Sequence, residues 1–318
     1  METGLVSTCF SCSPNGRCLS SFEVFQSGQR TLSQLSTEPD KLLQRGCQTG
    51  ALFQIRRALE LGASIFSHSF SAFLEAVRHG YLHIIKYLVQ SGGDLFILGE
   101  EAMCCAAQYG QVEVIRYLFE SGVHLSVRYN EPLMKAVISG HLDAVRYLIE
   151  SGYESQGWCN NVLLWAAEAG HLNIVKYAVE IGADIHVFND TPLYWASSNG
   201  HVSTVQYLIE RGADISTHGE GPLCLAAQRG HRDVVKLLVE SGADLHVEND
   251  YPLRWAAAEG HLDVVSYLVE SGANISALNN EALRRAASEG YGDVVNYLLE
   301  HGADPLALDS DEPLLSDE

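Results

Sequence analysis

The chain has 318 residues, 20 of them basic and 40 acidic, which gives a formal charge of −20 at neutral pH. Nucleic-acid-binding proteins need a basic face to displace counterions, and anionic membrane surfaces attract basic segments, so this balance argues against both targets. Two explanations of the acidic surplus stay open: the solubility of a long exposed protein, and the attraction of a basic partner.

Nothing in the sequence indicates secretion or membrane insertion. Residues Met1 to Cys12 lack the basic start and long apolar run of a signal peptide, and no apolar stretch approaches the roughly 20 residues that span a bilayer. The eight cysteines do not resemble a secreted disulfide framework. We therefore expect a soluble intracellular protein, in the cytoplasm.

The N-terminal segment, residues 1–38, is rich in Ser, Thr, Gln and Gly and shows no sustained period, which predicts a disordered segment or a small cap. Cys9, Cys12 and Cys18, with Cys47 as a distant fourth ligand, offer thiolates to zinc. Because a second closely spaced cysteine pair is missing, reduced cysteines without metal are the simpler interpretation. We predict no metal and no cofactor.

Residues 39–305 repeat every 30 positions. Three columns carry the period: glycine at 50, 80, 110, 140, 170, 200, 230, 260 and 290; glycine again at 62, 92, 122, 152, 182, 212, 242, 272 and 302; and alanine at 76, 106, 136, 166, 196, 226, 256 and 286. Periods of this length are typical of solenoids, in which each unit packs on its neighbours. We predict nine helix pairs, near 41–48 and 51–60 and then at 30-residue steps to 281–288 and 291–300.

One unit shows why two helices form. Thr191 can cap a helix, and Pro192 tolerates the first helical position because its missing N–H is not needed there. Gly200 breaks this helix and allows a tight turn. A second helix, Val202 to Glu210, has a broad apolar face, as expected between two neighbours. Gly212 ends it and leads into a short hairpin.

These residues resemble the ankyrin repeat. The family's T-P-L, A-A, G-H, V-V, L-L and G-A-D runs are present as Thr191-Pro192-Leu193, Ala226-Ala227, Gly230-His231, Val234-Val235, Leu237-Leu238 and Gly242-Ala243-Asp244. The resemblance implies an all-α ankyrin solenoid of about nine helix-turn-helix repeats, with a concave face made by hairpins and first helices. It also implies binding of other proteins on that face, with no shared catalytic residues.

The chain departs from the family pattern in two ways. The family repeat has 33 residues and this one has 30, with the loss between Asp184 and Thr191, so the hairpin should be shortened. The histidine after T-P-L is replaced by Tyr194, Cys224 or Arg254, which leaves its capping bond without a donor. Strict 30-residue repeats with K-Y-L-V helices most resemble the ankyrin arrays of giant amoebal viruses and some protists.

The fourth hairpin is irregular. Six repeats place an apolar side chain at the predicted buried start of the hairpin: Leu95, Leu125, Ile185, Ile215, Leu245 and Ile275. Ser155 stands at this position in the fourth repeat, followed by Gly157 and Trp158. We predict a structural weak joint there; a hinge or a ligand-contacting segment is the alternative.

Two polar columns have structural explanations. Five histidines, His141, His171, His201, His231 and His261, follow the first glycine column. Neighbours should lie roughly 10 Å apart, one helix layer each, so they cannot share a zinc ion with bonds near 2.0–2.1 Å. The family resemblance implies that they bond backbone between repeats. A tyrosine column on the second helices predicts packing, with the hydroxyls reaching water.

One column favours recognition. Trp165, Trp195 and Trp255 share a position that elsewhere holds Glu75, Cys105, Lys135, Leu225 and Arg285. Because packing alone would rarely admit Glu, Lys and Arg, we predict a partly exposed position near the concave side, where aromatic residues suit binding hot spots. Inter-repeat packing is the alternative. We include Gln228, Tyr109 and Trp158 in this predicted surface, and the mixed flanking charges predict only a modest dependence of binding on salt.

Residues 306–318 complete the chain as an acidic tail. No Ser-His-Asp set, phosphate loop or carboxylate pair rises above the repeat background, so we predict that the chain is not an enzyme. The predicted function is a monomeric protein–protein interaction module or adaptor with a protein partner. The alternative is a substrate adaptor for a ubiquitin ligase that docks through the N-terminal segment, although residues 1–50 contain no recognisable F-box.

Overall fold

The computed structural model describes residues 38–65, 70–123, 130–151, 158–216 and 221–309. The chain divides into two compact units: unit 1 holds residues 1–106 and 113–126, and unit 2 holds residues 107–112 and 127–318. The predicted N-terminal cap, the cysteines Cys9, Cys12 and Cys18, and residues 310–318 of the predicted tail lie outside the described residues. Those expectations stay predictions.

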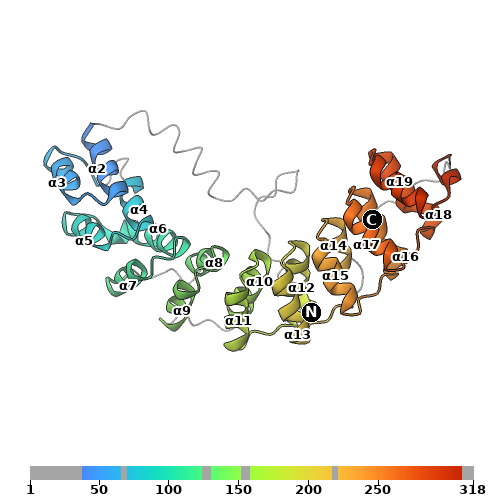
Figure 1. Ribbon diagram of the computed structural model, residues 1–318. Coiled ribbons are helices and arrows are strands. Elements are labelled where there is room, and N and C mark those ends of the chain that lie inside the picture. The colour runs from blue at the N-terminus through green and yellow to red at the C-terminus, as the bar shows by residue number, and fades with distance from the viewer. Residues whose placement is uncertain (1–37, 66–69, 124–129, 152–157, 217–220, 310–318) are drawn as a thin grey trace, which may run out of the picture. The chain divides into compact units, whose positions relative to one another are not determined.

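Each unit is a row of helix pairs (Figure 1). The pairs of unit 1 are α2 (Glu38–Thr49) with α3 (Leu52–Glu60), α4 (Phe70–Arg78) with α5 (Leu82–Gln90), and α6 (Leu95–Gln108) with α7 (Val112–Glu120). Those of unit 2 are α8 (Glu131–Ile138) with α9 (Leu142–Glu150), α10 (Trp158–Ala169) with α11 (Leu172–Glu180), α12 (Val187–Ser198) with α13 (Val202–Glu210), α14 (Pro222–Gln228) with α15 (Arg232–Glu240), α16 (Val247–Ala258) with α17 (Leu262–Glu270), and α18 (Ala277–Glu289) with α19 (Gly292–Glu300). A 3₁₀ helix, η1 (Pro305–Asp309), follows α19. These are 18 α-helices without a strand in the described residues, so the predicted helical solenoid is confirmed.

The core lies between successive pairs and follows the alanine column. All eight of its alanines, from Ala76 to Ala286, are fully buried. A larger side chain would push neighbouring first helices apart, because helix axes 8–10 Å apart leave room only for small groups at the closest point. The second helices contribute their Val, Ile and Leu residues, such as Val205 and Leu208, which are also fully buried.

The glycine between the two helices of a pair is required for two reasons, its backbone conformation and the lack of space for a side chain. Gly200 has a φ of 76°, a left-handed conformation that a side chain disfavours. A Cβ on Gly200 would also lie 2.7 Å from Nδ1 of His231 in the next repeat. The column therefore serves both the turn and the packing of the following histidine ring.

The shortened hairpin takes the form of a left-handed turn. In three repeats, three consecutive residues have positive φ angles of 47–59°: Phe188 to Asp190, Glu248 to Asp250, and Leu278 to Asn280. The third residue is Asp or Asn in each case, a residue type that tolerates this conformation. Its Oδ1 accepts a backbone N–H from the next repeat, as Asp190 does from Asp214 at 3.0 Å. The turn is thus fastened across the repeat boundary.

The apolar residues at the start of the hairpin are less buried than predicted. Ile185 and Ile275 are only half-buried. The nearby positions that are buried are Ala183 and Val187, two residues before and after Ile185. The short turn leaves the intervening side chain at its edge, so less apolar surface is removed from water there. Ser155, the basis of the predicted weak joint, lies outside the described residues.

The tyrosine column packs as predicted, with a partner that the sequence did not reveal. A cation from the preceding repeat lies over the ring: Arg56 over Tyr87 at 5.4 Å in unit 1, and Arg146 over Tyr177 at 4.7 Å in unit 2. Such contacts add about 0.5–1 kcal/mol at exposed sites. Tyr177 is buried rather than open to water, and this burial raises its pKa.

Candidate interaction surface

Six first helices of unit 2 carry the predicted aromatic column, which we name the first-helix strip. Its members are Lys135 of α8, Trp165 of α10, Trp195 of α12, Leu225 of α14, Trp255 of α16 and Arg285 of α18. Each precedes a buried residue of the alanine column, so the helix turns it toward the edge of the core. Lys135 and the three tryptophans are half-buried, as the column's composition predicted.

Two members of the strip contradict the prediction of partial exposure. Leu225 is 6% exposed and Arg285 is 8% exposed. An arginine in the column does not require exposure here, because its charge is neutralised inside the protein. The Glu281 carboxylate, itself fully buried, accepts a hydrogen bond from Arg285 Nε at 2.8 Å. Glu281 lies one turn before Arg285 on α18, so the two side chains meet on one helix face.

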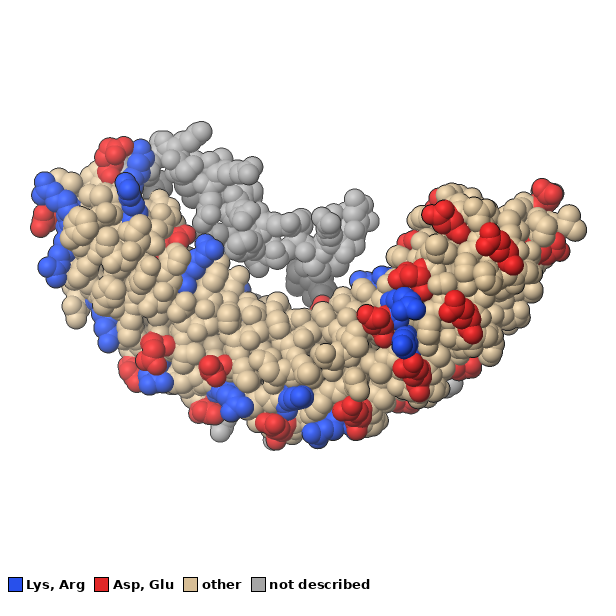
Figure 2. All heavy atoms as spheres, in the orientation of Figure 1, with Lys and Arg blue, Asp and Glu red and all other residues tan. Residues whose placement is uncertain are grey.

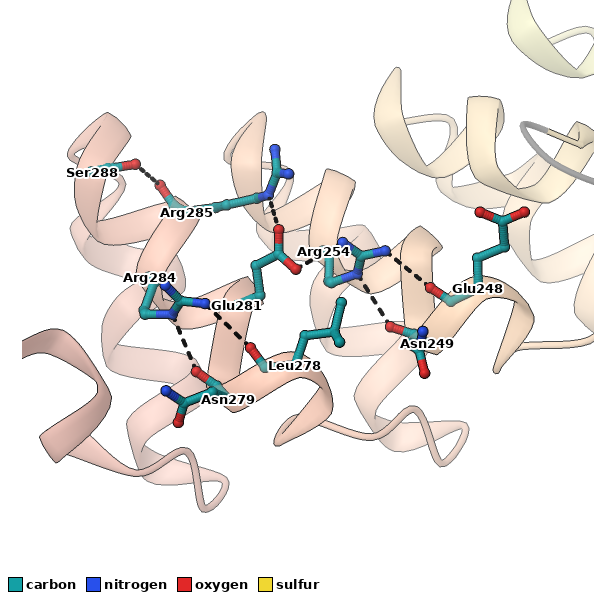
Figure 3. A network of polar contacts seen from close by, with 9 residues as sticks. All are labelled: Glu248, Asn249, Arg254, Leu278, Asn279, Glu281, Arg284, Arg285 and Ser288. Carbon is teal, nitrogen blue, oxygen red and sulfur yellow. Dashed lines mark hydrogen bonds and ion pairs between the residues drawn. The ribbon is translucent and has the colours of Figure 1, made fainter. Parts of the chain in front are cut away.

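Glu281 binds a second arginine from the preceding repeat (Figure 3). Arg254 of α16 donates from Nη1 to Glu281 Oε2 at 2.8 Å. Its other nitrogens donate to backbone carbonyls of the left-handed turn, at Asn249 and Glu248. Arg254 occupies the position of the family's missing histidine, and its bonds hold the carbonyls of the left-handed turn.

Arg284 repeats these contacts one repeat later. It donates to the carbonyl oxygens of Asn279 at 3.2 Å and Leu278 at 3.3 Å. Sequence reasoning missed the whole network. The available signal was the coincidence of Glu281, Arg284 and Arg285 in a helix whose other residues belong to the core.

The three tryptophans of the strip have different neighbours. The edge of Tyr194 meets Trp195, with ring centroids 5.3 Å apart. Trp255 lies 5.6 Å from Tyr251 and under the guanidinium of Arg285, 5.1 Å from its ring centroid. Trp255 Nε1 is buried without an acceptor among the described residues. Trp255 is therefore tied to the α16–α18 packing. Trp165 and Trp195 are half-buried as well, and their part in recognition stays a prediction.

Of the other predicted site residues, Trp158 and Gln228 border the strip and Tyr109 does not. Trp158 is half-buried and lies seven residues before Trp165 on α10, two turns away and thus on the same helix face. Gln228 is half-buried at the end of α14, and its carbonyl accepts the His261 ring at 2.9 Å. Tyr109 is half-buried in the turn after α6. It stands four repeats from Gln228, so the two do not form one site.

The histidine column is structural. Nε2 of each ring pairs with a backbone carbonyl of the preceding repeat at 2.8–3.0 Å, in the series His141, His171, His201, His231 and His261. Burial lowers the pKa of His231, which favours the neutral ring. No group of three or more metal-ligand side chains comes together within the described ranges.

A model of ankyrin repeats matches the chain in overlapping three-repeat windows, covering residues 43–129, 73–157, 125–189, 163–249 and 223–309. The chain belongs to the ankyrin-repeat family. Comparison with curated proteins finds no match. Ankyrin arrays are protein–protein interaction modules and are typically not enzymes, which agrees with the predicted class of function. In the described part of the chain, no helix combines the length and apolar character needed to cross a bilayer.

Proposed function

We propose that this ankyrin array is a non-enzymatic adaptor that holds a partner protein on the first-helix strip of unit 2. The half-buried rings of Trp165 and Trp195 carry the proposal, because solvent reaches two large aromatic side chains on adjacent repeats. Tryptophan is among the residues most enriched in interface hot spots. This face is the one that the family resemblance predicts to be concave.

The size of the strip suits one protein. Trp165 and Trp255 are three repeats apart, which corresponds to about 30 Å at ~10 Å for each helix layer. An interface of ordinary size buries about 800 Å² on each partner, an area that such a strip and its borders can supply. A monomeric array presents this surface once.

The test is affinity purification of the tagged chain from its cells, followed by mass spectrometry. Trp165→Ala and Trp195→Ala should each weaken capture of the partner, at about 2 kcal/mol or more for a hot spot. Phe188→Ala is the matched control, because Phe188 is 73% exposed and belongs to the left-handed turn before Trp195 and not to the first-helix strip. Loss of capture in Phe188→Ala but not in the tryptophan variants would move the binding surface to the turn tips.

The ubiquitin-ligase alternative predicts a different result in the same assay. Deletion of residues 1–37 should then remove ligase subunits while substrates remain bound. The proposed adaptor needs no such segment. An intracellular, cytoplasmic location and an origin in giant amoebal viruses or protists stay predictions from the sequence, and the 30-residue period supports the second.

A further inference from the structure

The surface charge of the last two repeats has one sign. Residues 246–309 contain three basic side chains, Arg254, Arg284 and Arg285, and all three are buried. Nine acidic side chains of the same segment are exposed: Glu248, Glu259, Asp263, Glu270, Glu289, Asp293, Glu300, Asp304 and Asp309. Figure 2 shows acidic side chains gathered over these repeats, α16 to α19. A partner that approaches this end of unit 2 meets only negative charge.

The borders of the strip carry two exposed acids and one exposed base, Arg229, which lies one turn after Leu225. Glu168 of α10 is exposed one turn after Trp165, and Glu259 is exposed one turn after Trp255. Lys135 contributes little positive charge, because its ammonium is paired with Glu131 at 3.2 Å. The mixed border that the sequence predicted is therefore wrong at Arg285, which is buried, and weak at Lys135, while Arg229 keeps one exposed positive charge between Trp195 and Trp255.

The chain itself shows what such a tryptophan binds. At Trp255, the residue in the same column of the next repeat is Arg285, whose guanidinium lies over the ring and is held by a carboxylate. Trp165 has the same ring position and a nearby carboxylate in Glu168, but the next residue of its column is Trp195. The next after Trp195 is Leu225. In the described residues no cation lies over either ring.

We propose that the partner is a basic protein segment whose arginine stacks on Trp165 or Trp195, with its guanidinium paired to Glu168. This inference rests on the proposed function and names the chemistry of the partner. Arginine fits better than lysine, because its planar guanidinium can stack on a ring and donate to a carboxylate at once. The acidic repeats beside the strip attract such a segment before contact and add to its association rate.

The probe is a synthetic 16-residue peptide with four arginines separated by Gly, Ser and Leu. Three matched peptides carry Lys, Gln or Glu at the same four positions. Binding to the full chain is followed by ¹⁹F NMR after incorporation of 5-fluorotryptophan, which gives one signal for each of the four tryptophans. Trp→Phe variants assign the signals, and isothermal titration calorimetry gives the affinities.

The arginine peptide should shift the signals of Trp165 and Trp195 and leave that of Trp255 nearly unchanged, because Arg285 already covers that ring. Loss of one exposed cation–π contact in Trp165→Leu should weaken binding about three- to fivefold. Glu168→Gln should weaken binding more than Glu259→Gln, its matched control at a covered ring. Affinity should fall from the arginine to the lysine peptide, be lost with Gln or Glu, and decrease with added salt.

Equal losses in Glu168→Gln and Glu259→Gln without ¹⁹F shifts would show diffuse charge attraction and overturn the stacking site. No binding of the arginine peptide would overturn it too. Neither result touches the purification experiment, in which the tryptophan variants lose the cellular partner whatever its charge. Capture that depends on Trp165 and Trp195 but resists high salt would keep the interface and reject a basic partner.

Discussion

Glu281 is the residue whose removal should do most damage for its size. It is fully buried and is the carboxylate shared by Arg254 and Arg285, with side chains 7% and 10% exposed. Removing one member of a buried ion pair typically costs 3–5 kcal/mol, because a charge is left without compensation. After Glu281→Ala, Arg254 keeps two backbone carbonyls and Arg285 keeps the Trp255 ring. We therefore expect the lower end, about 3 kcal/mol.

The loss should be local. Ankyrin stability is coupled mainly between neighbouring repeats, so the last pair, α18 and α19, should open before the rest of unit 2. Hydrogen exchange in Glu281→Ala should accelerate across residues 277–300 and stay near wild type in α10 and α11. Urea unfolding followed by circular dichroism would give the free energy and show a separate early transition.

A triple variant provides the control. Arg254→Met, Glu281→Leu and Arg285→Met together replace the network by apolar side chains of similar volume, which is often neutral or stabilising by about 1–4 kcal/mol for buried ion networks. The triple variant should therefore be more stable than Glu281→Ala alone. A loss below about 1 kcal/mol in Glu281→Ala, or a triple variant that is less stable than the single one, would refute the reasoning.

Four further predictions concern single positions. Thr204→Val should stabilise by about 1 kcal/mol in urea unfolding, because the buried Thr204 hydroxyl has no partner among the described residues. Asp190→Ala should speed exchange of the Asp214 amide while Asp190→Asn, which keeps the acceptor oxygen, should not. Burial and the nearby Glu75 charge raise the pKa of Cys47 to about 12, so iodoacetamide at pH 8 should label Cys47 only in urea. Burial lowers the pKa of His231 below its ordinary 6.5, so the contribution of the neutral ring to the free energy of unfolding is complete above pH 6.5 and is lost as pH falls through the folded-state pKa. An NMR titration of the ring would check the direction of the shift, and the stability of His231→Gln should depend less on pH in the acid range.

The fold could be predicted almost completely because its rules are repeated nine times. The second helices begin and end within one residue of the predicted positions. The left-handed turns could not be predicted from the repeat pattern. Three consecutive residues with positive φ occur here with an Asp or Asn side chain that accepts a backbone N–H of the next repeat. The signal was present in the sequence as Asp190, Asp250 and Asn280, each 24 residues before the amide that it binds.

The strip shows why a column cannot be assigned to core or surface as a whole. Substitution by Glu, Lys and Arg indicates exposure only if each charge is solvated, and at Arg285 the solvent is replaced by Glu281 and the face of Trp255. Burial of one arginine thus closes the strip at α18 and also removes the positive charge expected beside it. Arg285 covers Trp255, whereas among the described residues no cation lies over Trp165 or Trp195, and the acid Glu168 is exposed one turn after Trp165. Packing at one end of the column therefore determines the chemistry that the accessible part can recognise.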